Sequence, residues 1–113
     1  MKIDNAKAQM RKGVLEMCIL ASVRVERKYA TEILNHLKSV ELIVVEGTLY
    51  PLLARLRSAG LVSYEWEESV SGPPRKYYLL TKEGSLFLDE LTASWNALHK
   101  SVKSLTNPKP KKP

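Results

Sequence analysis

The sequence predicts a mainly α-helical chain with one small β-hairpin and a long C-terminal helix. Three patterns predict this fold class. Apolar residues recur at three- and four-residue spacing before residue 60, alternate with polar residues at 61–67, and follow a heptad repeat after residue 83. The chain has 113 residues, which is the usual size of one domain and is enough for a hydrophobic core.

The first helix is expected at residues 5–22. From Val14 onward its apolar surface nearly encircles it. A helix that is apolar on two sides needs a cover on both, so we expect the domain core on one side and a partner chain on the other. The second helix is expected at residues 29–39, after a charged connection at 23–28.

The third helix is expected at residues 47–59, where four leucines form a stripe at i, i+3, i+4 and i+7. Pro51 places its start near Gly47 or Thr48, because proline is tolerated only in the first turn of a helix. Gly60 follows as a C-terminal stop.

A β-hairpin is expected next. Val62, Tyr64 and Trp66 alternate with polar residues, which is typical of a half-buried strand. Residues 69–74 contain Gly-Pro-Pro and predict a turn, and residues 76–80 form a second β-prone run. The two runs together predict a hairpin with a polar, proline-bearing tip.

Thr81 is placed to cap a long helix that extends to about residue 105. Its apolar positions are spaced by four and three residues in turn, and they form a heptad seam of Gly84, Leu88, Leu91, Trp95, Leu98, Val102 and Leu105. Such a helix spans roughly 36 Å, which is more than so small a core can cover, so a partner helix is expected. Residues 107–113 alternate proline and lysine and are expected to be a disordered tail.

Three helices followed by a hairpin is the order of a winged helix-turn-helix, in which the third helix enters the major groove of DNA and the hairpin, or wing, contacts the backbone. We therefore expect a DNA-binding domain at 1–81, whose first helix also contacts the partner, a dimerisation helix at 82–106, and the tail at 107–113. The predicted dimer contacts are Leu88, Leu91, Trp95, Leu98 and Val102.

The predicted DNA-binding residues lie on the third helix and just after the hairpin turn. Small residues and hydroxyls near a helix N-terminus allow close approach and phosphate contacts, and two cations at a hairpin tip can reach a phosphate or the minor groove. The residues are Gly47, Thr48, Tyr50, Pro51, Arg55, Arg75 and Lys76. An ordinary surface helix or a charged edge strand that discourages aggregation would carry similar residues. DNA contact and a purely structural role therefore both stay open at this point.

The net charge of +6 lies at the two ends of the chain. Residues 13–106 carry eleven basic and eleven acidic side chains and are therefore neutral overall. We expect modest non-specific attraction to DNA, assisted by the basic ends.

The sequence shows no pattern typical of an enzyme, a metal site or a secreted protein. His36 and His99 lack partners at metal-ligand spacing, Cys18 lies in an apolar run as a core thiol does, and the glycines are too scattered for a phosphate loop. A single cysteine forms no internal disulfide, and there is neither a signal peptide nor a membrane-spanning apolar run. We expect a cytoplasmic chain that is not an enzyme, takes no cofactor and does not bind a membrane.

Two segments resemble the PadR family of transcriptional regulators. Residues 46–62, from Glu-Gly-Thr-Leu-Tyr-Pro-Leu-Leu-Ala-Arg-Leu to Gly-Leu-Val, are similar to the family signature. Residues 75–84, Arg-Lys-Tyr-Tyr-Leu-Leu-Thr-Lys-Glu-Gly, are similar to its wing strand and the start of its last helix. The resemblance covers about residues 10–100 and implies a dimeric winged-helix repressor of the shorter type with a single C-terminal helix. Residues 29–33, Tyr-Ala-Thr-Glu-Ile, depart from the Gly-Tyr-Glu-Ile that is usual in the family.

The resemblance also implies an effector, because several members respond to small and often aromatic molecules. Trp95 follows Ser94 as it does in short multidrug-binding members. A planar aromatic molecule stacking on Trp95 in the dimer is one interpretation, and simple packing of Trp95 in the dimer core is the other.

A different function class also stays open. The chain could be a winged-helix protein-interaction module without specific DNA binding, because several acidic residues adjoin the expected DNA face. These residues are Glu46, Glu65, Glu67 and Glu68.

Overall fold

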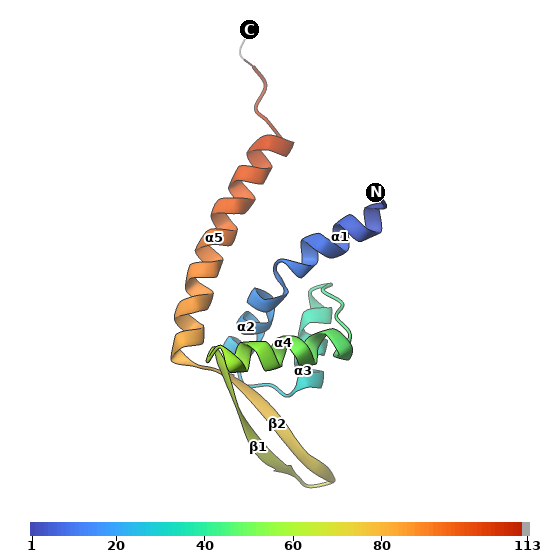
Figure 1. Ribbon diagram of the computed structural model, residues 1–113, viewed down its shortest axis with the longest axis vertical. Helices are drawn as coiled ribbons and strands as arrows, with labels where there is room; N and C mark the ends of the chain where they lie inside the picture. The colour runs from blue at the N-terminus through green and yellow to red at the C-terminus, as the bar shows by residue number, and fades with distance from the viewer. Residues whose placement is uncertain (112–113) are drawn as a thin grey trace.

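The computed structural model describes residues 1–111 and shows five helices and one antiparallel hairpin over that range (Figure 1). In chain order the elements are α1 (Ile3–Lys12), α2 (Leu15–Val25), α3 (Ala30–Ser39), α4 (Glu46–Ser58), β1 (Val62–Ser69), β2 (Gly72–Leu80) and α5 (Lys82–Thr106). The predicted fold class, a winged helix-turn-helix with a long last helix, is confirmed.

The single first helix predicted at 5–22 is wrong, because the chain breaks there into α1 and α2. The break falls at Gly13, which caps α1, and at Val14, whose φ of −115° departs from the regular helical value and which precedes the first residue of α2. Glycine costs a helix conformational entropy, and here no packing offsets that cost, since α1 has no buried residue. In Figure 1, α1 extends away from the body of the molecule. At the other end α2 continues to Val25, which shortens the predicted connection.

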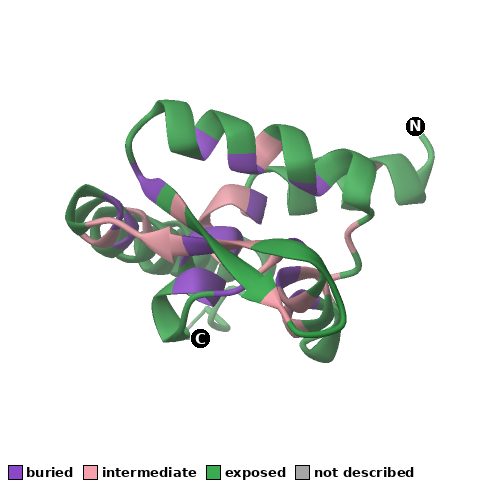
Figure 2. Ribbon diagram, turned by 90° about the horizontal axis from the view of Figure 1, so that it is seen from below, coloured by how far each residue is buried: buried purple, intermediate pink, exposed green. Residues whose placement is uncertain are grey.

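The hydrophobic core lies where α2, α3, α4, the base of the hairpin and the start of α5 meet. Figure 2 shows the buried segments gathered at this centre and most of the hairpin exposed. The predicted leucine stripe of α4 supplies Leu49, Leu53 and Leu56, all of which are buried, and Leu52 packs at the edge. The helices thus hold α4 by one side and leave its other side accessible.

The start of α4 lies one or two residues earlier than predicted, at Glu46. Pro51 is therefore inside the helix, where it cannot donate a hydrogen bond to the Gly47 carbonyl one turn earlier. The predicted stop is confirmed, because Gly60 has a φ of +77° and the amide of Leu61 donates to the carbonyl of Leu56.

The hairpin turn lies at residues 70–71, so the predicted turn at 69–74 is too long. Ser69 pairs with Gly72, and the two prolines that follow belong to β2. Prolines fit there because β2 is an edge strand whose outer side needs no ladder hydrogen bonds at these positions. The register places Tyr64 opposite Tyr78 and Trp66 opposite Lys76.

Helix α5 begins as predicted at a Thr81 cap, whose hydroxyl accepts a hydrogen bond from the amide of Gly84 at 2.9 Å. Leu88, a predicted dimer contact, is only 2% exposed and packs in the chain's own core, because the base of α5 lies against α2. The rest of the seam turns outward, and Trp95, Leu98, Val102 and Leu105 are exposed. In the predicted tail, residues 107–111 have no regular secondary structure, and residues 112–113 lie outside the described residues.

The close approach of α5 to the start of β1 gives a test of the packing. A Cβ added at Gly84 would lie 2.0 Å from the Leu61 carbonyl oxygen, so Gly84→Ala forces the helix away from the hairpin base. We expect it to lower the free energy of unfolding by about 1–3 kcal/mol or more, measured by urea denaturation. Gly47→Ala is the matched control, since a Cβ there meets nothing within 4 Å and adds helix propensity. Equal stability of the two variants would contradict the packing described.

Candidate DNA-binding surface

A groove of about 320 Å³ lies between the hairpin and the N-terminal ends of α3 and α4. It is lined by Tyr29, Ala30, Thr31, Tyr50, Trp66, Pro74, Arg75, Lys76 and Tyr78. Three of the predicted DNA-binding residues, Tyr50, Arg75 and Lys76, therefore meet in one place although 25 residues or more separate the first from the others along the chain.

The predicted residues of α4 divide between two sides of the helix. Tyr50 faces the groove, and Arg57, two turns later on the same side, lies over the Tyr64 ring of β1. Thr48 instead lines a second groove with Arg11 and Lys12 of α1. Arg55 is drawn to α2, where its guanidinium lies 2.8 Å from the Glu16 carboxylate. Thr48 and Arg55 are thus not brought together with the wing cations.

Gly47 and Pro51 lie between these two sides and are exposed. A Cβ at Gly47 would meet no atom within 4 Å, so the surface beside the first turn of α4 is open. This turn also carries the unpaired amides and the positive end of the helix dipole, which favour a phosphate.

The two wing cations lie within β2, four and five residues after the turn, and not at the tip as predicted. The Arg75 guanidinium lies 4.7 Å from the centre of the Tyr29 ring, and the Lys76 ammonium lies 4.0 Å from the centre of the Tyr64 ring. Tyr29 in turn packs edge-on against Tyr77 at 5.4 Å. Aromatic rings hold both cations at the groove.

Two of the three acidic residues of β1 share one cation. Arg27 donates hydrogen bonds to the carboxylates of Glu65 and Glu67 and lies 4.3 Å from the centre of the Tyr77 ring. Desolvation lowers the pKa of Arg27, but these hydrogen bonds outweigh it and the pKa lies above its ordinary value. Two of the acidic residues that favoured a protein-interaction module are therefore already paired.

The strand that carries the cations is fixed to the helices through Tyr78. Its amide donates to the Lys28 carbonyl at 2.8 Å, and the Lys28 amide donates back to the Tyr78 carbonyl at 3.1 Å. The Tyr78 side chain is buried, and burial raises the pKa of its hydroxyl, with smaller contributions from Tyr50 and Tyr64. These contacts fix β2, which forms one side of the groove, to the segment that leads into α3.

Most residues of this surface were not predicted as site residues, and four of them make its main aromatic and cationic contacts. Tyr29 and Trp66 line the groove, and Arg57 and Tyr64 join α4 to the hairpin. The alternation at 61–67 indicates that Tyr64 and Trp66 share a face of the strand, but it does not indicate which cations that face meets.

The histidines and the cysteine have structural contacts. The Nδ1 atom of His36 lies 2.7 Å from the Ser22 hydroxyl, and His99 stacks on Trp95. Cys18 is half-buried, and burial raises the pKa of its thiol. Within residues 1–111 no three metal-ligating side chains gather, and no helix is both long and apolar enough to cross a membrane.

The comparison with known proteins identifies the family. Residues 19–90 match the Transcriptional regulator PadR-like family. The chain belongs to this family. As a PadR-like protein it is a DNA-binding transcriptional regulator, and the resemblance seen in the sequence is confirmed.

Solved structures of PadR-like proteins share the fold over most of the chain. A PadR-like transcription factor from Bacteroides fragilis is 56% identical and has a TM-score of 0.75, with 89% of this chain and 98% of that chain covered. A PadR family regulator from Eggerthella lenta is 34% identical, with a TM-score of 0.86 and coverage of 95% and 94%. A PadR-like regulator from Bacillus cereus is 37% identical, with a TM-score of 0.81 and coverage of 89% and 99%.

Proposed function

We propose that this PadR-like chain is a homodimeric, sequence-specific repressor that binds DNA through α4 and the wing. The observation that carries the proposal is the groove that brings Tyr50 of α4 together with Arg75 and Lys76 of β2. In a winged helix-turn-helix the third helix of the motif, here α4, enters the major groove while the wing follows the backbone. Exposed Gly47 and Pro51 allow the first turns of α4 to approach the bases closely.

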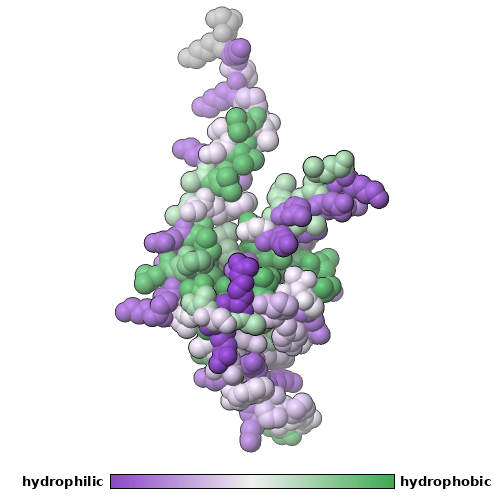
Figure 3. All heavy atoms as spheres, viewed as in Figure 1, coloured by the Kyte–Doolittle hydropathy of each residue, from purple (hydrophilic) through white to green (hydrophobic). Residues whose placement is uncertain are grey.

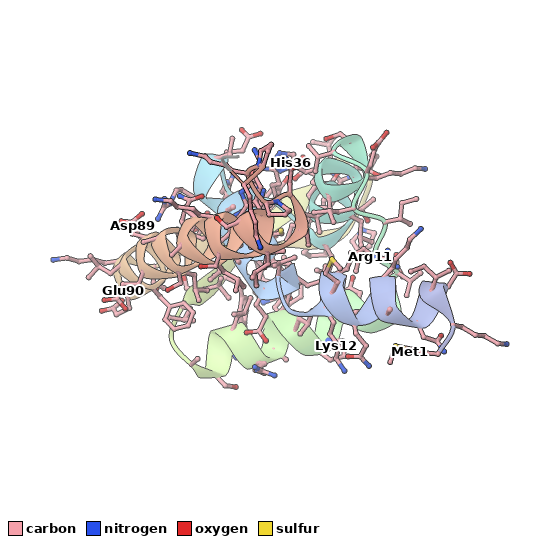
Figure 4. The ribbon with its side chains drawn as sticks, turned by 90° about the horizontal axis from the view of Figure 1, so that it is seen from above. Met1, Arg11, Lys12, His36, Asp89 and Glu90 are labelled. Atoms are coloured by element: carbon pink, nitrogen blue, oxygen red, sulfur yellow. The ribbon has the colours of Figure 1, made fainter. Side chains whose placement is uncertain are left out.

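The charge distribution supports recognition by a few well-placed cations. Residues 13–90 carry nine basic and eleven acidic side chains, a net charge of −2, so the positive excess lies before and after them. Both ends of the chain lie opposite the hairpin (Figure 1), and Figure 4, viewed from that end, shows Arg11 and Lys12 projecting from α1. The N-terminal cations Arg11 and Lys12 nevertheless share a groove with Thr48, so we expect them to assist non-specific binding beside the start of α4. At the wing, affinity depends on the local cations of the hairpin groove.

The exposed apolar surface supports a dimer. Figure 3 shows apolar surface along α5 and between α5 and α1. It includes Trp95, Leu98, Val102 and Leu105 on α5 and Ile3 and Met10 on α1. A two-fold partner would cover such a seam with its own copy of the same residues. In this arrangement residues 1–81 bind DNA and residues 82–106 join the protomers.

A cavity beside this surface supports an effector. It measures about 330 Å³ and lies between the α1–α2 junction and α5. Its apolar wall includes Val14, Met17, Phe87, Leu91 and Trp95. A planar aromatic molecule would stack on the exposed indole of Trp95 and fill this space. The repressor role and the release by such a molecule follow the resemblance to effector-responsive members, and the site of action is the cytoplasm, where the DNA would be.

The wing prediction concerns Arg75 and Lys76. The Arg75→Ala and Lys76→Ala double variant should weaken binding to specific and random duplexes alike, and the slope of log affinity against log salt should fall by about 2. Fluorescence anisotropy over a salt series measures both quantities. Lys100→Ala with Lys103→Ala is the matched control, since it removes the same charge from the far end of α5. Unchanged affinity and slope in the wing variant would remove the wing from the proposed site.

The dimer prediction concerns Leu98, which is exposed in the single chain and therefore not needed for its core. Leu98→Asp would place a charge in the dry interface, at a cost of about 2–5 kcal/mol for the lost leucine and more for the charge. Sedimentation should then show a monomer, and circular dichroism should show the helical content of the unchanged protein. Asn96→Asp, an exposed position off the seam, should stay dimeric. An unchanged chain that sediments as a monomer at micromolar concentration would refute the dimer.

The effector prediction uses Trp95 as the only fluorophore, in a Trp66→Phe background. Planar aromatic compounds should quench its emission saturably at one molecule per dimer, and Trp95→Ala should abolish their binding, measured by calorimetry, without separating the protomers. A varied panel that gives no quenching up to about 1 mM, a binding free energy of about 4 kcal/mol, would leave Trp95 as a packing residue only.

A further inference from the structure

Some cations of the molecule are paired with carboxylates and others contact aromatic rings alone, while Arg27 makes both kinds of contact. Within residues 1–111, Arg24, Arg27 and Arg55 form ion pairs with carboxylates, to Asp89, to Glu65 and Glu67, and to Glu16. Over the same range Arg57, Arg75 and Lys76 form no ion pair and lie over aromatic rings instead. A carboxylate cancels the charge it holds, whereas a neutral ring orients a cation and leaves its charge available to a phosphate.

Tyr64 is the ring that two of these cations share. The Arg57 guanidinium carbon lies 4.2 Å from its centre, and the Lys76 ammonium lies 4.0 Å from it. The two cations come from different elements, since Arg57 is in the last turn of α4 and Lys76 is in β2. Tyr64 itself is half-buried and packs against the core, so its ring has a fixed place.

The neighbouring rings keep Tyr64 oriented. Trp66 lies edge-on to it at 6.3 Å, and Tyr78 lies tilted to it at the same distance. Both also face the Lys76 ammonium, at 5.7 and 5.8 Å. The ring of Tyr64 therefore makes the contacts with both cations.

We propose that Tyr64 is a positioning residue for DNA binding, which holds Arg57 of α4 and Lys76 of the wing as one phosphate-binding pair. This inference rests on the proposed function and adds Arg57 to the residues that contact DNA. Long basic side chains lose rotamer freedom when they bind a phosphate, and two that are already held by a ring lose less. The ring also offsets the mutual repulsion of two neighbouring positive charges. Helix and wing therefore meet the duplex at a fixed separation.

The test combines the ring with the cations it holds. Tyr64→Leu keeps an apolar side chain that can pack against the core but removes the ring, and we expect it to weaken binding to the operator about tenfold. Tyr64→Phe keeps the ring face and should bind within about twofold of the unchanged protein. In a chain that already carries Arg57→Gln and Lys76→Gln, Tyr64→Leu should have almost no further effect, because no cation remains for the ring to position.

A second measurement needs neither DNA nor a substitution that could unfold the chain. In the free protein the Hε protons of Lys76 should show upfield NMR shifts from the surrounding rings, and Tyr64→Phe should preserve these shifts. Ordinary shifts in the folded, unchanged protein would overturn the inference.

The outcomes separate this inference from the proposed function. An unchanged protein that binds neither specific nor random duplex would overturn the proposed function and the inference with it. Normal binding by the unchanged protein, together with full affinity in Tyr64→Leu, would overturn the inference alone. So would an equal loss of affinity from Tyr64→Leu with and without the two cations, because the ring would then act through the fold.

Discussion

The attachment of the wing to the helices is the interaction on which the rest of the site depends. Two backbone hydrogen bonds join Lys28 and Tyr78, and the Lys28 ammonium, which is buried, donates to the Ser22 carbonyl near the end of α2 at 2.7 Å. These bonds tie β2 to the segment that leads into α3. Tyr29 follows directly in that segment and meets Arg75, so the position of one wing cation is set by the same bonds. Without this attachment the hairpin would be a two-stranded sheet of marginal stability.

The electrostatics of the molecule follow from this rigid frame. A net charge of −2 over residues 13–90 gives little general attraction to a polyanion, so the cations at the groove act through their placement. Glu65 and Glu67 of β1 are paired with Arg27, whereas Glu68 lies beside Trp66 and Pro74. Arg75 and Lys76 are instead held by rings and keep their charge. Fixed local charges of this kind contribute more to the specificity of DNA binding than to its overall affinity.

The parts of the fold that depend on local patterns could be predicted from the sequence. The leucine stripe of α4, the stop at Gly60 and the cap at Thr81 are local signals, and each lies where it was expected. The break at Gly13 was missed because the apolar pattern continues across it, and only the absence of packing around α1 allows the helix to end there. The turn was misplaced because Gly72 and the prolines after it are common in turns, whereas the pairing of the strands decides their position.

The candidate site was predictable only in part, because local sequence patterns do not show which elements meet in space. Tyr50, Arg75 and Lys76 could be assigned from their places on the third helix and near the turn. The contacts of Arg57 and Lys76 with Tyr64, and of Arg55 with Glu16, each join residues of two different elements. They depend on the twist of the hairpin and on the direction of α2, which no local pattern specifies.

The central claim is that the groove between α4 and the wing binds DNA in a sequence-specific way. A gel-shift titration tests it most directly, with the duplex upstream of the chain's own coding sequence as the probe and random duplex as the competitor at one fixed salt concentration. Binding to the upstream duplex should be at least about a thousand times tighter than binding to random DNA. Equal affinity for the two duplexes, or no retardation of either, would contradict it and would favour a winged helix that binds protein.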